Sequence, residues 1–179
     1  MSVIHEETKA LVERLNRDTP QSLLLTGPLG IGLLTIASLV SESSPSTIII
    51  EPEKTPTTRK ITVERIRNLY QETRSKSTTK QFIIVHEADA MTSSAQTAFL
   101  KLLEEPGTNI HFILTSHQPN TLLPTILSRV QQHAARPITR HQSEEYLTAL
   151  GVTDATKRQQ LLFIASGLPE ELQHLVDDE

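Results

Sequence analysis

The most constraining feature of the sequence is a series of four short apolar runs, separated by segments with helical periodicity. The runs span residues 22–26, 47–51, 82–86 and 111–115, and each is nearly continuous in apolar residues. Such runs are typical of strands that are buried on both faces of a parallel sheet. A weaker fifth run, 132–136, is assigned to the sheet on its spacing alone. Because strands alternate with helices, the pattern predicts βαβ units and an α/β fold with a parallel five-stranded sheet.

Three segments have the periodicity of amphipathic helices: 6–15, which precedes the first run, and 63–72 and 93–105, which lie between later runs. The last is the clearest, with Thr92 in position to cap its first turn and Pro106 following its last. The buried face of the helix over 63–72 is predicted to include Val63, Ile66, Leu69 and Tyr70. The polar segments 41–46 and 53–60 are predicted to be loops.

The character of the chain changes after Pro137, where three helix-like segments (143–150, 154–165 and 169–176) follow one another with no strand between them. We therefore predict an α/β domain over residues 1–138 and a small three-helix lid over residues 139–179.

Composition excludes several kinds of binding site and argues against a membrane protein. The chain has 179 residues, 17 basic against 21 acidic, and no cysteine, which excludes disulfides and thiolate metal sites. Glycines interrupt the least polar stretch, 23–40, so it does not predict a membrane span, and the N-terminus lacks the layout of a secretion signal. The histidines lack metal-ligand spacing. We expect a cytoplasmic protein without a membrane partner, metal or cofactor.

One segment, 54–80, carries eight basic residues against two acidic ones. It could contact the phosphates of DNA, although a solvated charged face is the favoured interpretation. The candidate contacts are Arg59, Lys60, Arg65 and Arg67.

A glycine-rich loop follows the first predicted strand and opens a helix, where a phosphate-binding loop would lie. Its backbone pattern suits phosphate, but Leu33 stands in the position of the lysine and Leu34 in that of the Mg²⁺-binding hydroxyl. Thr35 comes one position late, about 100° further round the helix. The alternative is a simple strand-to-helix turn. Either interpretation disfavours nucleotide hydrolysis. The loop residues singled out are Gly27, Pro28, Gly30, Gly32, Leu33 and Leu34.

The third apolar run ends in an acidic cluster, where a hydrolytic ATPase carries an aspartate for Mg²⁺ and a glutamate for water. His86 takes the place of the aspartate and is a poor ligand for a hard cation, whereas Glu87 keeps the glutamate position and Asp89 follows. Both halves of a metal-nucleotide site are thus degenerate.

The segment from Phe82 to Arg129 resembles the clamp-loader branch of the AAA+ ATPases, most closely the delta-prime subunits of bacterial DNA polymerase III. The resemblance rests on A-x-x-A-x-L-K-x-L-E-E-P at residues 95–106 and L-L-P-T-I-x-S-R at residues 122–129. It implies a P-loop NTPase-like (AAA+) fold and extends over about residues 20–175. The chain departs from the family in having Val130 after Ser128-Arg129, no four-cysteine zinc module and no C-terminal collar domain. It would therefore be a truncated or reduced member.

The resemblance also implies roles for single residues. Arg129 would be an arginine finger that acts in a neighbouring subunit's ATP site; its alternative is a solvated surface arginine. Thr115 occupies a γ-phosphate sensor position, although a strand-end hydroxyl is the favoured interpretation. Glu171 stands where the lid would carry an arginine, and it places a negative charge there instead.

The expectation for the whole chain is a non-hydrolysing clamp-loader subunit, inactive as an ATPase by itself. Its partners would be the clamp-loader ATPase subunit and the other loader subunits, with the sliding clamp and primed DNA contacted indirectly. Two rivals stay open: a stand-alone AAA+-derived interaction adaptor, and a weak NTPase that uses Thr35 and Glu87.

Overall fold

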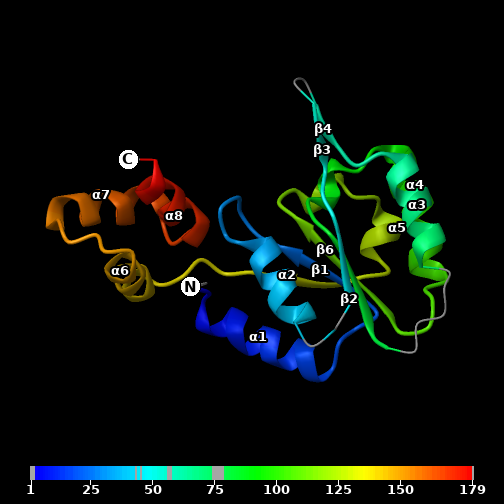
Figure 1. The fold of residues 1–179 in the computed structure, drawn as a ribbon, viewed down its shortest axis with the longest axis horizontal. Helices are drawn as coiled ribbons and strands as arrows, with labels where there is room; N and C mark the ends of the chain where they lie inside the picture. The colour runs from blue at the N-terminus through cyan, green and yellow to red at the C-terminus, as the bar shows by residue number, and fades with distance from the viewer. Residues whose placement is uncertain (1–2, 43, 45, 56–57, 74–78, 179) are drawn as a thin grey trace.

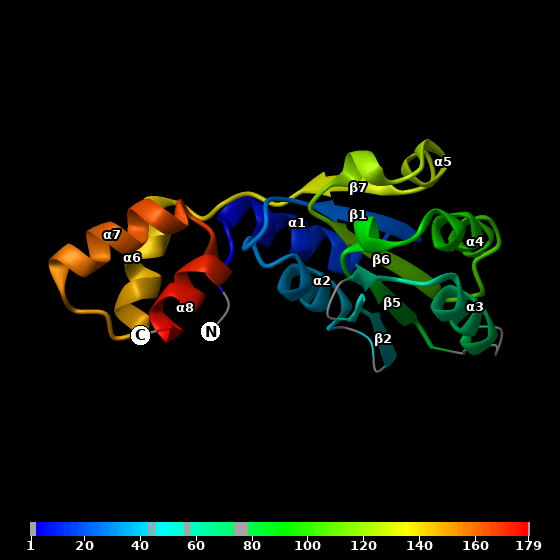
Figure 2. The ribbon, with the colours of Figure 1, turned by 90° about the horizontal axis from the view of Figure 1, so that it is seen from above.

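The computed structural model describes residues 3–42, 44, 46–55, 58–73 and 79–178. A parallel sheet lies between two layers of helices, and three further helices pack at one end of it (Figures 1 and 2). No helix in the described part of the chain is long and apolar enough to cross a membrane.

The sheet has five strands in the order β2-β5-β6-β1-β7, and every pairing is parallel. β5 and β6 carry buried residues along most of their length, which confirms the prediction of a buried parallel sheet. The strands are β1 Ser22–Thr26, β2 Ser46–Ile50, β5 Gln81–Val85, β6 Ile110–Ser116 and β7 Gln131–Ala134.

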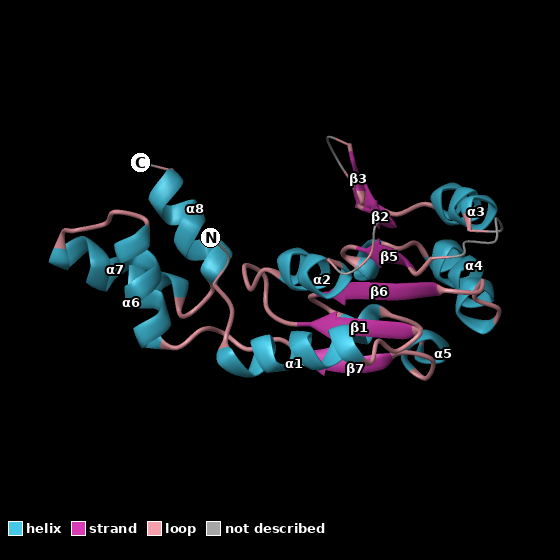
Figure 3. Cartoon of the chain, turned by 60° about the horizontal axis from the view of Figure 1, so that its bottom comes forward, coloured by secondary structure: helices cyan, strands magenta, loops and turns pink. Residues whose placement is uncertain are grey.

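Each face of the sheet has its own hydrophobic core. Figure 3 shows the strands of the sheet with the helices around it. On one face α1 (Glu6–Arg17) and α2 (Leu33–Ser41) pack on β1 and β5. On the other, α3 (Val63–Glu72), α4 (Ser93–Glu104) and the short α5 (Pro124–Leu127) cover β5 and β6. Short 3-10 turns precede α4 and α5 at Ala88–Ala90 (η1) and Pro119–Thr121 (η2).

The C-terminal helices are α6 (Arg140–Ala149), α7 (Ala155–Ala165) and α8 (Pro169–Asp177). They surround a separate core that contains Tyr146, Leu147 and Leu172. A capping box at Thr139 begins α6, which satisfies backbone donors that the first turn leaves open. The predicted domain division after residue 138 stays a prediction.

Three expectations were wrong in part. The segment 53–60 contains an antiparallel hairpin, β3 (Glu53–Lys54) and β4 (Arg59–Lys60), rather than a simple loop. β2 is an edge strand, so it is not buried on both faces, and Ile49 is exposed. Tyr70 is 36% exposed because it lies one residue beyond Leu69, which faces the sheet, and is thereby turned about 100° away from the core.

Candidate functional site

The degenerate loop connects the end of β1 to the start of α2, on the side of the sheet where the parallel strands have their carboxyl ends. Gly30 and Gly32 both have left-handed backbone conformations, with φ of 82° and 86°, which glycine adopts without strain. Leu33, in the position of a phosphate-binding lysine, is buried in the core beneath the loop. A Cβ at Gly27 would lie 3.0 Å from Ile31 Cγ2, so the protein's own apolar side chains fill the inside of the turn.

Helix α8 begins directly on this loop. The backbone N–H of Glu170 donates a hydrogen bond of 3.0 Å to the carbonyl of Gly30. A Cβ at Gly30 would lie 3.4 Å from Glu171 Cβ, and one at Gly32 would lie 3.6 Å from Glu170 Oε1. The first turn of α8 thus brings two acidic residues against the segment that would hold phosphate.

The space between loop and lid is a cavity of about 220 Å³, lined by residues that include Thr35, Glu170 and Gln173. Small-molecule pockets usually measure roughly 300–1,000 Å³. The cavity is therefore small for a nucleotide, and it is bordered by a carboxylate.

The acidic cluster at the end of β5 is held by contacts within the protein. Arg59, from the β3–β4 hairpin, pairs with Glu87, whose side chain is only 14% exposed. His86 Nδ1 lies 2.9 Å from Thr115 Oγ1, and the N–H of Glu87 donates to the same hydroxyl at 3.0 Å. Burial lowers the pKa of His86 below its usual value, although the Glu87 carboxylate acts in the opposite direction.

Asp89 is also engaged. Its Oδ1 accepts a hydrogen bond of 3.1 Å from the N–H of His117. His117 Nδ1 lies 2.9 Å from the carbonyl of Gly27, so this histidine joins the cluster to the degenerate loop. Among the described residues, no three His, Cys, Asp or Glu side chains are grouped so that they could hold a metal ion together. The structure thus brings together the loop, His86, Glu87, Asp89, Thr115 and Glu171, and it adds His117, Arg59 and Glu170, which sequence reasoning did not place there.

Arg129 lies at a different place, just after α5. Its Nη2 is 2.9 Å from Glu104 Oε1, and its Nη1 donates to the carbonyl of Thr125 at 3.0 Å and to Ser128 Oγ at 3.3 Å. The side chain is 38% exposed. Its guanidinium is therefore oriented by neighbours and still open to solvent on one side.

The side chain of Gln96 forms hydrogen bonds with the backbone of the segment that precedes Arg129. This side chain of α4 is 5% exposed. Its Oε1 accepts a hydrogen bond of 2.8 Å from the N–H of Leu123, and its Nε2 donates to the carbonyl of Thr121 at 3.3 Å. In the sequence Gln96 comes three residues before Phe99, and so lies on the same side of the predicted helix as this apolar residue. That position is the signal that could have identified it, because buried polar groups require partners.

The four candidate DNA contacts do not form one free basic surface. Arg59 is paired with Glu87, and Arg65 is paired with Glu72 at 3.2 Å. Lys60 lies on the exposed hairpin, and Arg67 lines a groove on another part of the surface. Two further basic residues of the segment, Arg74 and Lys76, lie outside the described residues. Direct DNA contact stays a prediction.

Comparison with known proteins adds a family assignment. A family model described as "DNA polymerase III, delta subunit" matches residues 35–139. The DNA polymerase III subunit delta' of Pseudomonas aeruginosa is 33% identical over 140 residues, which are 76% of this chain and 42% of that protein. The DNA polymerase III subunit delta' of Bacillus subtilis is 33% identical over 98 residues, 55% of this chain and 29% of that protein. The chain thus spans less than half the length of these two relatives.

The fold has a similar counterpart among solved structures. RuvB, the Holliday junction branch migration motor of Thermotoga maritima, matches with a TM-score of 0.73 at 12% identity, over 97% of this chain and 61% of that one. This likeness and the sheet topology confirm the expected fold class, a P-loop NTPase-like (AAA+) parallel sheet with flanking helices and three helices after it.

Proposed function

The chain belongs to the DNA polymerase III delta subunit family, and on that premise we propose that it serves as a delta-prime-like subunit of a clamp loader. In this role it sits beside an ATP-hydrolysing subunit and contributes Arg129 to that subunit's site, without hydrolysing ATP itself. Its direct partners are the clamp-loader ATPase subunit and the other loader subunits. The sliding clamp and primed DNA are engaged through the assembly.

The contact between α8 and the degenerate loop carries the non-hydrolysing part of the proposal. Nucleotide would have to displace the hydrogen bond from Glu170 to Gly30 and enter beside two acidic residues. Hydrolysis also requires a metal-bound phosphate, yet Leu33 is buried and Glu87 is already paired with Arg59. Each of these features opposes productive binding of a Mg²⁺-nucleotide.

A calorimetric titration of the purified chain with Mg²⁺-ATP tests this part. We expect no saturable heat and no phosphate release. Turnover that depends on Mg²⁺ and is abolished by Glu87→Gln would instead support a weak NTPase.

The exposure and anchoring of Arg129 support the second part. A guanidinium stabilises the charge that develops on a transferring phosphoryl group, and an arginine finger contributes roughly 10³–10⁵ in rate. Such a side chain must be accessible to the neighbour, and Arg129 is 38% exposed on a segment that Gln96 holds in place.

The test uses the reconstituted loader with clamp and primed DNA. We expect Arg129→Ala to lower the ATPase rate of the complex by at least about tenfold, since an arginine finger contributes that much or more, and Arg129→Lys to restore little of it. Arg140→Ala, which removes an exposed arginine from α6, is the matched control. Complex mass, measured by light scattering with and without ATP, must be unchanged by each variant. An assembled complex whose ATPase does not respond to Arg129→Ala would refute the finger assignment, and failure of the unaltered chain to assemble would favour the adaptor.

A further inference from the structure

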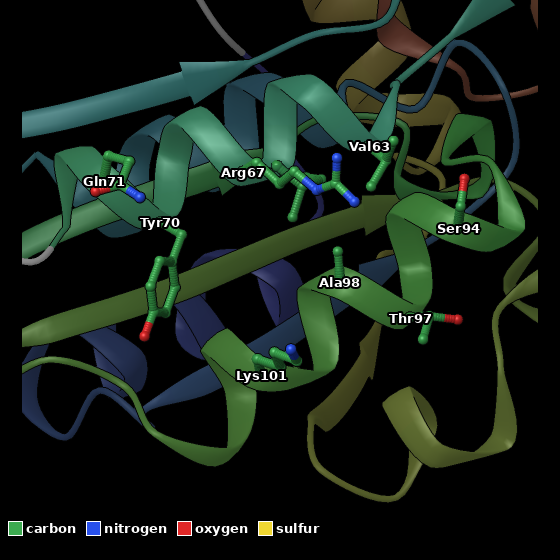
Figure 4. Close-up of a pocket in the computed structure, with 9 residues that line it drawn as sticks. Val63, Arg67, Tyr70, Gln71, Ser94, Thr97, Ala98 and Lys101 are labelled. Carbon is green, nitrogen blue, oxygen red and sulfur yellow. The ribbon is translucent and has the colours of Figure 1, made fainter.

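A surface groove runs between α3 and α4, and neither the degenerate loop nor Arg129 lines it. Its volume is about 720 Å³. Figure 4 shows that side chains from the two helices face one another across it. The groove, called here the α3–α4 groove, is lined by Val63, Ile66, Arg67, Tyr70, Gln71, Ser94, Thr97, Ala98 and Lys101.

The floor of the groove is apolar. Val63, Ile66 and Ala98 contribute aliphatic surface, and the ring of Tyr70 stands between the helices with 36% of the residue exposed. Tyrosine offers a large apolar area with few rotatable bonds, and it is enriched among the residues that dominate binding energy at protein interfaces. This floor suits an apolar side chain better than a phosphate.

The sides of the groove are cationic. Arg67 from α3 and Lys101 from α4 both reach into the space between the helices. Within the described part of the chain neither makes an ion pair, and no carboxylate lines the groove. By contrast, Arg65 on the same helix is neutralised by Glu72. The groove therefore presents two uncompensated positive charges above an apolar floor, in a protein whose net charge is −4.

We propose that the α3–α4 groove binds an acidic peptide segment that carries at least one large apolar side chain. Carboxylates of the segment pair with Arg67 and Lys101, and its apolar side chain packs against Tyr70 and Ala98. An apolar centre with a polar, charged rim is the usual anatomy of a protein interface. Nucleic-acid surfaces instead depend on rows of donors to phosphate. This site is separate from the proposed arginine finger and does not depend on it.

Fluorescence anisotropy with the full chain tests the proposal. The probe is a labelled ten-residue peptide in which aspartate alternates with leucine and phenylalanine. Two control peptides replace the aspartates by lysine or the apolar residues by glycine. A single-stranded oligonucleotide of the same length and label represents nucleic acid. We expect saturable binding of the first peptide alone, with a Kd below about 1 mM, the weak end of measurable association.

Variants of the chain distinguish the contribution of the two positive charges from that of the apolar floor. Reversal of both cations, Arg67→Glu with Lys101→Glu, should weaken binding at least about tenfold, and Ala98→Leu, which fills the floor, should weaken it without changing any charge. Lys9→Glu removes an exposed cation from α1 on the other side of the sheet and should leave binding unchanged. Circular dichroism melting verifies that each variant folds, and Lys101→Gln replaces the double reversal if that variant does not.

Three results with the unaltered chain would overturn the proposal. They are absence of saturable binding by the acidic-apolar peptide, equal binding of the glycine-substituted peptide, and tighter binding of the oligonucleotide. The last would identify the groove as a nucleic-acid contact. Binding that Lys9→Glu weakens as strongly as the groove variants do would also refute it, because that would indicate attraction by overall charge.

Discussion

The carboxylate of Glu104, the last residue of α4, pairs with the guanidinium of Arg129 at 2.9 Å. This contact joins the end of a core helix to the segment proposed to act on a neighbouring subunit. In the sequence Glu104 falls at the end of the helix predicted over 93–105, and in the structure it is a direct neighbour of the arginine. If Arg129 acts in trans as proposed, its guanidinium would exchange this carboxylate for phosphate.

The Glu104–Arg129 pair should add little to stability. Both side chains are well exposed, at 51% and 38%, and pairs of this kind contribute about 0–1 kcal/mol. A double-mutant cycle with Glu104→Gln and Arg129→Ala, measured by urea unfolding, should give a coupling free energy below about 1 kcal/mol. A coupling of several kcal/mol would show that the pair is a structural anchor, and Arg129→Ala would then be unsuitable as a functional variant.

Three glycine substitutions should rank by what the added methyl meets. Gly151→Ala, Gly30→Ala and Gly167→Ala all place alanine at positive φ, which costs about 1–2 kcal/mol. At Gly151 the new Cβ has open space, at Gly30 it lies 3.4 Å from Glu171 Cβ, and at Gly167 it lies 2.5 Å from the carbonyl oxygen of Ile138. We expect the unfolding free energy to fall most for Gly167→Ala, and by similar, smaller amounts for Gly30→Ala and Gly151→Ala, because 3.4 Å is an ordinary van der Waals distance. Equal losses at all three positions would mean that the backbone at Ile138 gives way to the added methyl group.

Loss of Arg59 should cost more than loss of an ordinary surface arginine. Arg59→Gln leaves Glu87 without its partner at 14% exposure, whereas Arg140→Gln frees Glu144, which is 42% exposed. An unpaired, partly buried carboxylate carries a desolvation penalty. Arg59→Gln should therefore lower the unfolding free energy by about 1 kcal/mol more than Arg140→Gln. Similar losses, compared by urea unfolding at one pH, would argue against a structural role for the Arg59–Glu87 pair.

The free energy of unfolding should fall on mild acidification, because burial disfavours the charged form of two histidines. Burial lowers the pKa of both His86 and His133 below the usual value. The unfolded chain then binds protons before the folded protein does, so stability is fully present above about pH 6.5 and is lost as the pH falls through the folded-state values. Urea unfolding at about pH 7.5 and about pH 5.5 should show this loss.

His86→Gln should reduce that loss, because glutamine does not titrate. If His86→Gln retains the full pH dependence, the histidine at the end of β5 does not contribute to it.

Much of the fold could be predicted from local sequence. Four apolar runs predicted four strands of the sheet, spacing predicted the fifth, and the helix over 63–72 was predicted with the bounds that the structure gives it. The degeneracy of the nucleotide site was also readable, because it lies in the identities of Leu33, Leu34 and His86. The edge position of β2 and the exposure of Tyr70 could not be predicted this way, since strand order and helix orientation depend on what packs alongside.

Residue identity and short-range periodicity are properties of the sequence itself, and they determined the fold class, the altered phosphate loop and the position of Arg129 in a recognisable motif. Only the tertiary structure decided that Arg59 pairs with Glu87, that Glu104 pairs with Arg129, and that α8 rests on Gly30. These contacts join residues that are far apart in the chain, and they form only when the sheet, its helices and the C-terminal helices have packed together. The same packing places Arg67 and Lys101 across a common groove.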